Sequence, residues 1–224
     1  MATTTIAARV FRDRLLRRSR RVGLAIQPRL ATALTEYYEL LARWNRKINL
    51  TSITQPDEAI DRLLLEPLVA CRYLPAGRPL TVLDIGSGGG SPAIPLKLAS
   101  PDMAMSMVES KVRKSAFLRE AVRHLSLSST SVETSRYEEL LARPDLHEAA
   151  DIVTLRAVRA EPRTLMSLQA FLKPGGWFLL FRSATGPDVP ANVPPPLVWL
   201  ATYPLVESLR SRLVIIQKRP VGHG

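Results

Sequence analysis

Cysteines, histidines and long apolar runs are scarce in this chain of 224 residues. The single cysteine, Cys71, excludes an internal disulfide and a cysteine-based zinc site. His124, His147 and His223 are scattered along the chain, so we expect no metal site. No apolar run approaches the roughly 18–20 residues that a membrane-spanning helix needs. We expect a cytoplasmic protein without a membrane partner, and we take it to be a monomer.

Acidic side chains are few relative to basic ones. The chain has 31 Lys and Arg against 20 Asp and Glu, which gives a formal net charge of +11. Residues 1–30 hold eight arginines and one acid, Asp13. Such a cluster attracts polyanions and speeds their capture, so we expect it to hold an RNA backbone. The alternatives are a solvated tail, a transit peptide or a basic amphipathic helix on a membrane, although interleaved apolar residues disfavour a transit peptide.

The sequence up to residue 75 has a helical rhythm. In residues 29–48 apolar side chains recur at spacings of three and four, which places them on one helix face. Residues 57–74 repeat the pattern, and Pro75-Ala76-Gly77 forms a closing turn. We predict a basic N-terminal helical extension over residues 1–75, followed by a core over residues 76–224.

From Leu80 onward, short β-rich runs alternate with helical runs. We predict strands at 80–85, 103–109, 130–134, 151–155 and 176–182, with helices at 92–99, 111–125 and 164–172. This alternation indicates right-handed βαβ units and an α/β fold with a mostly parallel, Rossmann-like sheet. After a Pro-rich loop at 186–197, two more strand-like runs, 197–203 and 213–218, are close enough to pair antiparallel.

A glycine-rich turn, Asp84-Ile85-Gly86-Ser87-Gly88-Gly89-Gly90, ends the first predicted strand. Glycines tolerate positive φ and let a ligand approach the backbone, and ligands of open α/β sheets bind beyond the carboxyl ends of the strands. Ser91 stands where the dinucleotide pattern G-x-G-x-x-G requires glycine, which disfavours a nicotinamide enzyme.

Two acids accompany this turn. Asp84 can hold the turn through backbone N–H groups or meet a cationic ligand, and Glu109 can accept both hydroxyls of a ribose. In the alternative interpretation Asp84 only caps the turn and Glu109 is a surface acid. A site with acids and few anion-binding groups suits S-adenosylmethionine, which carries a sulfonium cation and no pyrophosphate.

Four further residues are expected at the same edge of the sheet. Tyr137 and Glu138 follow the third strand, in a loop that borders the adenine in a sheet of this topology. Arg156 ends a central strand and needs an anionic or π-rich partner, in the crevice or in a plain salt bridge. Arg182 ends the fifth strand and adds a second cation to the rim.

Roughly residues 22–218 resemble a known family, the bacterial 7-methylguanosine methyltransferases of small-subunit ribosomal RNA, historically called glucose-inhibited division protein B. The most specific segments are 44–53 (WNRKINLTSI), 84–96 and 111–118 (KVRKSAFL). The resemblance implies a class I methyltransferase sheet with an antiparallel last strand. It also implies S-adenosylmethionine as the cofactor and ribosomal RNA or the small ribosomal subunit as the partner.

The resemblance, together with the glycine turn and the ribose argument, gives seven expected cofactor-contacting positions. The resemblance gives Gly86, Ser91, Tyr137, Glu138 and Arg156, to which the glycine turn and ribose argument add Gly88 and Glu109. The chain departs from the family pattern in four places: Leu63 replaces His, Pro67 replaces Ser, Leu155 replaces Ser, and Arg182-Ser183 replaces Lys-Gly. We expect these changes to crowd the nucleotide side of the site.

The reaction that the resemblance implies is methyl transfer to guanine N7. Because N7 has an unprotonated lone pair at neutral pH, no general base is required, and no catalytic residue is assigned. Candidates for positioning the substrate are Arg156, Arg182 and Asn49. The alternatives are a non-catalytic RNA-binding or ribosome-assembly factor on the same fold, and a methyltransferase for another RNA or a small molecule.

Overall fold

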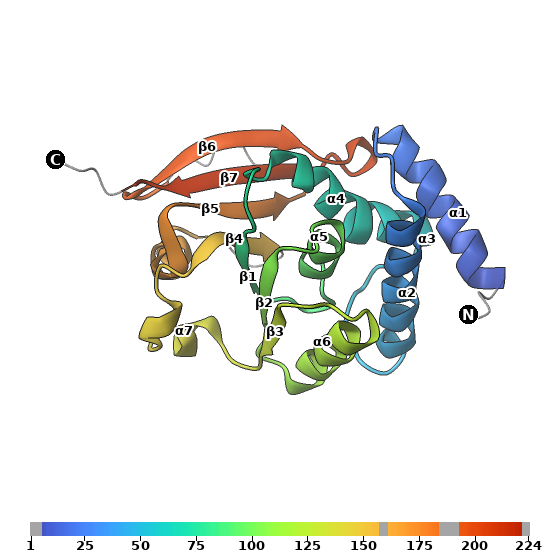
Figure 1. The fold of residues 1–224 in the computed structure, drawn as a ribbon, viewed down its shortest axis with the longest axis horizontal. Helices are drawn as coiled ribbons and strands as arrows, with labels where there is room; N and C mark the ends of the chain where they lie inside the picture. The colour runs from blue at the N-terminus through green and yellow to red at the C-terminus, as the bar shows by residue number, and fades with distance from the viewer. Residues whose placement is uncertain (1–5, 157–160, 184–192, 221–224) are drawn as a thin grey trace.

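A seven-stranded sheet forms the centre of the computed structural model, which describes residues 6–156, 161–183 and 193–220 (Figure 1). The strand order is β3-β2-β1-β4-β5-β7-β6. The strands are β1 (Thr81–Ile85), β2 (Ala104–Val108), β3 (Thr130–Glu133), β4 (Ala150–Arg156), β5 (Leu172–Arg182), β6 (Leu197–Pro204) and β7 (Arg212–Lys218). Strands β1 to β5 pair in parallel and β7 pairs antiparallel with both β5 and β6, which confirms the predicted sheet.

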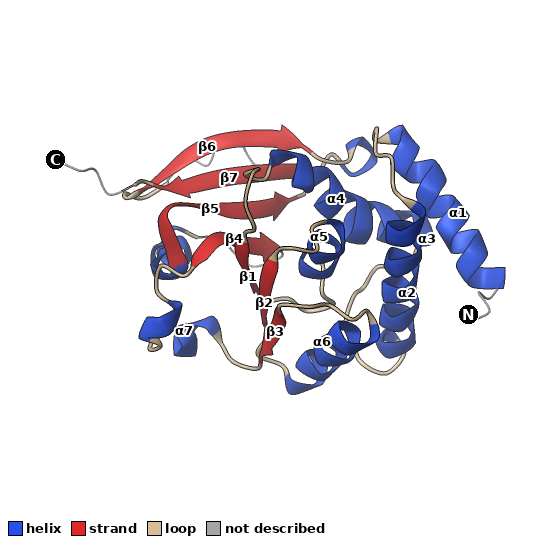
Figure 2. Ribbon diagram, viewed as in Figure 1, coloured by secondary structure: helices blue, strands red, loops and turns tan. Residues whose placement is uncertain are grey.

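Helices cover both faces of this sheet (Figure 2). They are α1 (Ile6–Arg21), α2 (Pro28–Asn45), α3 (Pro56–Ala59), α4 (Glu66–Ala70), α5 (Ala93–Ala99), α6 (Val112–His124), α7 (Tyr137–Leu140) and α8 (Pro162–Leu168). The short turns are η1 (Ile60–Leu65), η2 (Cys71–Tyr73), η3 (Pro144–Leu146), η4 (Gln169–Phe171) and η5 (Glu207–Leu209). Proline at the start of α2, α3 and α8 fits because the first helical N–H has no partner within the helix.

One predicted element differs from the structure in detail, and another lies mostly outside the described residues. The helix predicted over 57–74 is divided into α3, the π-helix η1, α4 and the 3-10 turn η2. Most of the Pro-rich loop predicted at 186–197 lies outside the described residues, which resume at Val193. None of the helices in the described ranges combines the length and the apolarity that a bilayer span requires.

The arginine-rich N-terminal segment is a packed helix rather than a solvated tail over residues 6–21. Its apolar face is buried at Ala8, Phe11 and Leu15. The Phe11 ring stacks on the ring of Tyr38 in α2, with 4.0 Å between the centroids. The apolar face of α1 therefore packs against the protein's own core. The helix lies along the outer edge of the molecule (Figure 1).

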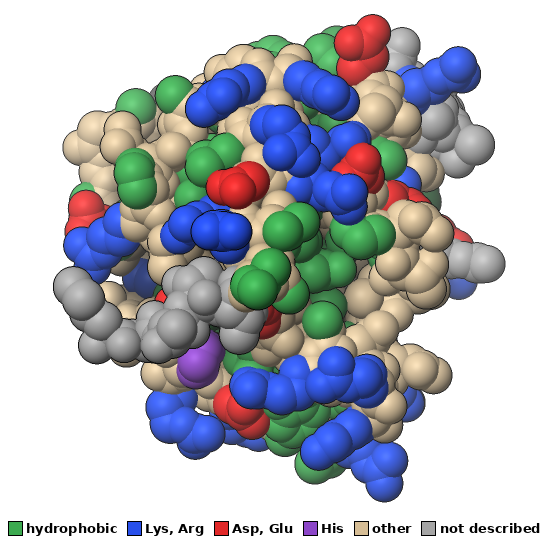
Figure 3. Space-filling view, turned by 90° about the vertical axis from the view of Figure 1, so that its right-hand side faces the viewer, with side chains coloured by type: hydrophobic (Ala, Val, Ile, Leu, Met, Phe, Trp, Pro, Cys, Tyr) green, Lys and Arg blue, Asp and Glu red, His purple; other side chains and the backbone are tan. Residues whose placement is uncertain are grey.

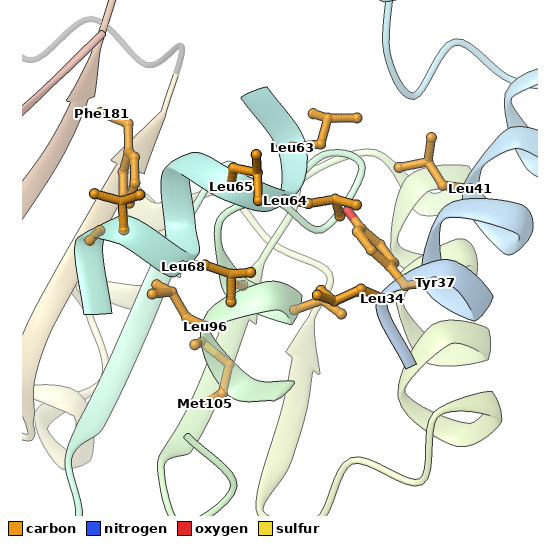
Figure 4. Close-up of a cluster of buried hydrophobic side chains, with 14 of the residues drawn as sticks. Leu34, Tyr37, Leu41, Leu63, Leu64, Leu65, Leu68, Leu96, Met105 and Phe181 are labelled. Atoms are coloured by element: carbon orange, nitrogen blue, oxygen red, sulfur yellow. The ribbon is translucent and has the colours of Figure 1, made fainter. Parts of the chain in front are cut away.

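The N-terminal helices and the sheet share one hydrophobic cluster. Figure 4 shows Leu34, Tyr37 and Leu41 of α2 directed toward the leucines at positions 63–65 and 68, with Leu96 and Met105 below them. Burial of each such leucine stabilises the fold by roughly 1.5–3 kcal/mol. A second cluster fills the other face of the sheet, under α7 and α8. The described part of the N-terminal segment, residues 6–75, is thus fixed against the strands that carry the site.

Candidate functional site

A cavity of about 750 Å³ opens at the carboxyl ends of β1, β4 and β5. Its lining comes from the glycine turn, the α2–α3 loop, the helical turn η1 and the ends of the strands. The residues are Leu41, Leu50, Thr51, Ser52, Ile53, Glu58, Arg62, Leu63, Glu66, Gly86, Ser87, Gly88, Gly89, Ser91, Glu109, Lys114, Leu155, Arg156, Leu180, Phe181, Arg182 and Ser183. The cavity lies where the sequence places a ligand.

The glycine turn has positive φ at three of its glycines. Gly86 has φ of 74°, Gly88 has φ of 51° and Gly90 has φ of 85°. A Cβ at Gly90 would in addition lie 2.5 Å from the Ile94 Cδ1 atom of α5. The N–H groups of Gly86 and Ser87 both donate to the Val108 carbonyl, at 2.9 and 3.0 Å. These bonds fix the start of the turn to the neighbouring strand β2.

The Glu109 carboxylate closes the turn from the second strand. Oε2 accepts the Gly88 N–H at 3.0 Å, and Oε1 accepts the Lys111 N–H at 2.8 Å. The residue is only 7% exposed and its side chain borders the cavity, so the interpretation as a surface acid is wrong. A carboxylate has about four lone-pair sites, so two further acceptor positions can meet hydroxyl groups of a ligand.

Helix α2 holds the same turn from the opposite side. The Tyr37 hydroxyl donates to the Gly89 carbonyl at 2.6 Å. The sequence pattern identifies Tyr37 only as a member of an apolar helix face, and its polar function has no local signal. Tyr37 is fully buried, so its phenol needs such an acceptor.

Asp84 lies beneath the turn, 1% exposed. Its Oδ1 accepts the Thr154 hydroxyl of β4 at 2.5 Å, instead of a backbone N–H of the turn. Its Oδ2 is buried without a hydrogen-bond partner among the described residues. Burial raises the pKa of Asp84, and the hydrogen bond from Thr154 acts against that rise. The side chain ties β1 to β4 and is not among those that line the cavity.

Arg156 forms the centre of a buried polar network on the cavity wall. Nη2 binds Glu66 Oε2 at 2.7 Å, and Nη1 binds the Ser91 hydroxyl at 3.0 Å. The guanidinium also lies over the Phe181 ring, 4.8 Å from its centroid. Arg156 thus has both the anionic and the π-rich partner that its place at the end of β4 requires. Burial raises the pKa of Glu66 and lowers that of Arg156, and their attraction opposes both shifts.

The π-helix η1 supplies carbonyl groups to this network. Arg156 Nη1 binds the Arg62 carbonyl at 2.5 Å, and the Ser91 hydroxyl donates to the Leu63 carbonyl at 2.8 Å. The Glu66 N–H bonds to the carbonyl of Asp61, and Pro67 has no N–H to offer. Pro67 therefore helps to leave the carbonyls of η1 open to side chains from other elements.

The α2–α3 loop is organised by the first asparagine of its motif. Asn45 Oδ1 accepts the N–H groups of Leu50 and Thr51 at 2.8 and 2.9 Å, and its Nδ2 donates to the Thr51 carbonyl at 3.0 Å. This places Leu50 and Thr51 on the cavity wall. Asn49, which we selected from the sequence, is exposed and does not line the cavity.

The other predicted residues occupy separate places. Arg182 is exposed at the mouth of the cavity, with the apolar replacements Leu63 and Leu155 on the wall beside it. Tyr137 and Glu138 open α7 beyond β3 and are not among the lining side chains. Their contact with an adenine stays a prediction. No group of three or more His, Cys, Asp or Glu suited to a metal ion occurs within the described ranges.

Comparison with known proteins identifies similar sequences across most of the chain. Residues 30–188 match the family described as rRNA small subunit methyltransferase G, GidB. The chain is 38% identical over 189 residues to the Ribosomal RNA small subunit methyltransferase G of Xylella fastidiosa, covering 83% of this chain and 86% of that protein. It is 32% identical to the Bacillus subtilis protein of the same name, covering 74% of this chain and 70% of that protein.

Solved structures share the fold at low sequence identity. A putative O-methyltransferase from Klebsiella pneumoniae superposes with a TM-score of 0.59, at 14% identity, over 88% of this chain and 92% of that one. A SAM dependent methyltransferase from Aquifex aeolicus gives a TM-score of 0.55, at 14% identity, over 80% and 98%. These similarities support the predicted methyltransferase sheet.

Proposed function

The chain belongs to the family of small-subunit ribosomal RNA methyltransferases G, and from this membership we propose that it methylates N7 of a guanosine in small-subunit ribosomal RNA, with S-adenosylmethionine as the methyl donor. The membership is the observation that carries the proposal. The cavity at the carboxyl ends of the strands supports it, because the glycine turn, Glu109 and Arg156 meet there.

The residues of the cavity fit this cofactor. Glu66 Oε1 and Arg156 Nε are buried and have no hydrogen-bond partner within the described residues. One is an acceptor suited to an ammonium group, and the other is a donor suited to a carboxylate, which are the two ends of a zwitterionic amino acid. Glu109 would hold the ribose, and Gly86, Gly88 and Ser91 would border the rest. We keep Tyr137 and Glu138 as the proposed contacts of the adenine.

When bound, S-adenosylmethionine supplies an electrophilic methyl group. The chain's residues then need only to position the acceptor, because guanine N7 carries no proton for a base to remove. Effective molarities of aligned groups correspond to roughly 7–11 kcal/mol. Glu66 neutralises Arg156 at 2.7 Å, so this pair places no net positive charge beside a purine that becomes cationic. Arg182, exposed at the mouth, would bind phosphate or guanine O6.

Methyl transfer from isotopically labelled S-adenosylmethionine to small ribosomal subunits that lack the modification would test the proposal. After transfer, the RNA is digested to nucleosides and analysed by mass spectrometry. We expect the label in 7-methylguanosine. Label in another nucleoside would show a methyltransferase that acts on a different target. Binding of cofactor and RNA without transfer would favour an assembly factor, and transfer only to small molecules would exclude RNA as the substrate. We further infer a monomer that acts in the cytoplasm.

A further inference from the structure

We propose that the exposed side of α1 is a second RNA-binding surface, which grips phosphates of the ribosomal RNA outside the cavity. We call it the α1 arginine face, and it consists of Arg9, Arg17, Arg20 and Arg21. The proposal rests on the proposed function, because it takes the family's RNA as the partner. It adds a surface that lies before residue 30, where the match to the family begins.

Six of the seven arginines of α1 divide into two groups, and the seventh, Arg12, is partly buried. Arg14 and Arg18 turn toward the protein and pair with Asp57 and Asp61. The four of the α1 arginine face are exposed, and none of their guanidinium groups has an ion pair within the described residues. Exposed arginines without acidic partners keep their donors available for phosphate oxygens, which guanidinium binds in bidentate geometry.

The orientation of α1 is fixed by a buried ion pair. Arg18 Nε binds Asp61 Oδ1 at 2.6 Å, and the Ser208 hydroxyl of η5 donates to Asp61 Oδ2 at 2.6 Å. The Asp61 side chain is only 4% exposed. At the end of the helix, the Arg72 guanidinium donates to the Gly23 carbonyl. These contacts fix one side of α1 to the rest of the protein, so the α1 arginine face points away from the core.

The same short segment that anchors α1 also borders the cavity. Asp57 and Asp61 face α1, whereas Glu58 and Arg62, each one position further along, line the cavity. The helix and the cavity mouth thus lie on two sides of α3 and η1. Figure 3 shows this side of the molecule, with Lys and Arg side chains gathered above and below a patch of hydrophobic side chains. An RNA that enters the cavity can therefore meet basic side chains beyond its edge.

Helix stability alone does not account for these arginines. Basic residues near a helix C-terminus favour the helix dipole, which suits Arg20 and Arg21 in the last turn. Arg9 lies in the first turn, where a positive charge is unfavourable and no acid offsets it. A polyanionic partner better explains an exposed arginine at this position.

A polynucleotide fits this face better than a lipid bilayer. A membrane-bound amphipathic helix inserts its apolar face, but Phe11 and Leu15 of α1 are buried within the protein. Ile6 and Val10 are the exposed large apolar side chains of the described part of α1. An RNA backbone needs no apolar insertion and offers a phosphate to each arginine.

The test compares two double variants of the full chain that remove equal charge. One is Arg9→Ala with Arg17→Ala. The control is Arg123→Ala with Arg219→Ala, two exposed arginines at the end of α6 and just after β7. Binding to small-subunit ribosomal RNA transcribed in vitro is measured at several KCl concentrations, together with the unfolding midpoint and methyl transfer.

We expect the α1 variant to bind about tenfold more weakly and to lower the slope of log Kd against log salt by about two. Its unfolding midpoint should stay equal to that of the parent chain, and the control should bind like the parent.

Equal binding of both variants and the parent would overturn the proposal, even if the parent methylates RNA normally. A parent that binds RNA through α1 yet transfers no methyl group would refute the proposed function and support the surface. Binding to phosphatidylglycerol vesicles that exceeds RNA binding, and that the α1 variant loses, would reassign the face to a membrane.

Discussion

The hydroxyl of Tyr37 and the carbonyl of Gly89 join the N-terminal helices to the glycine turn, at 2.6 Å across 52 residues of sequence. Burial of the phenol raises the pKa of Tyr37 above its ordinary value, so the hydroxyl is a proton donor at neutral pH. The turn has three glycines with positive φ, at positions 86, 88 and 90, and ordering a glycine costs more backbone entropy than ordering any other residue. The helix α2 therefore stabilises one conformation of the turn before a ligand binds.

Replacement Tyr37→Phe should weaken both the fold and cofactor binding. The variant removes one hydrogen bond and leaves the Gly89 carbonyl without that donor, at a cost of about 1–3 kcal/mol in the free energy of unfolding. We expect the Kd for S-adenosylmethionine to rise several-fold, measured by titration calorimetry beside urea unfolding. Tyr38→Phe is the matched control, because Tyr38 contributes its ring to the stack on Phe11. If both variants bind the cofactor equally well, the turn does not depend on Tyr37.

Removal of Arg156 should have two separable effects. From the sequence alone, Arg156→Ala is expected to lower activity severely while leaving the fold intact. The structure adds that the variant leaves the Glu66 carboxylate buried and unpaired, which costs about 3–5 kcal/mol in stability. We therefore expect loss of both activity and stability, measured by methyl transfer and by urea unfolding.

A paired replacement separates the two effects. Arg156→Met with Glu66→Leu replaces the buried pair by apolar side chains of similar volume, which is often neutral for stability. We expect this variant to unfold near the parent chain but to bind S-adenosylmethionine poorly, because both candidate groups for its amino acid end are gone. A double variant that keeps cofactor affinity would assign the pair a purely structural role.

The strands and the glycine turn could be predicted because their signals are local. Alternation between β-rich and helical runs defines the sheet, and Glu109 follows the second strand at a fixed distance from the turn. The partner of Arg156 could not be chosen in this way. Glu66 lies 90 residues earlier, and several acids of the chain satisfy the same electrostatic requirement.

The loop-organising role of Asn45 could not be predicted from the sequence for a different reason. Asn45 and Asn49 are chemically identical and close in sequence. Which of them organises the loop depends on where α2 ends, and Asn45 is its last residue. Helix ends are poorly defined by periodicity, so the pattern could not distinguish the two. Likewise, the sequence shows that Pro67 lacks an N–H. Only the structure shows that the side chains of Ser91 and Arg156 bond to the carbonyls of η1.

At the amino end of β4, Asp151 should make the free energy of unfolding depend on pH. Burial alone would raise the pKa of Asp151, but hydrogen bonds from Arg78, the Thr81 N–H and Lys173 outweigh burial and lower it to about 2. Because the folded-state pKa lies below the unfolded value of 3.8, the stabilisation is present above pH ~4 and lost as the pH falls through about 2.

The matching variant is Asp151→Asn, studied by urea unfolding from pH 7 to pH 2. We expect the variant to be less stable at pH 7 by about 1–2 kcal/mol, a range that allows for solvent around Arg78 and Lys173. The two unfolding free energies should converge as Asp151 of the parent chain becomes protonated. A difference that stays constant over this range would show that hydrogen bonding, rather than charge, stabilises this corner.

Arg182→Ala should separate RNA recognition from cofactor binding. Arg182 is exposed at the cavity mouth and lies opposite Arg212 in the antiparallel pair of β5 and β7. Like charges directly opposite each other do not stabilise a sheet, so the free energy of unfolding should not fall. We expect an unchanged Kd for S-adenosylmethionine, a KM for RNA raised about tenfold, and a salt slope lowered by about one, as for the loss of one phosphate contact. Arg219→Ala controls for the lost charge. A variant that loses cofactor affinity as well would move Arg182 from the RNA side of the site to the cofactor side.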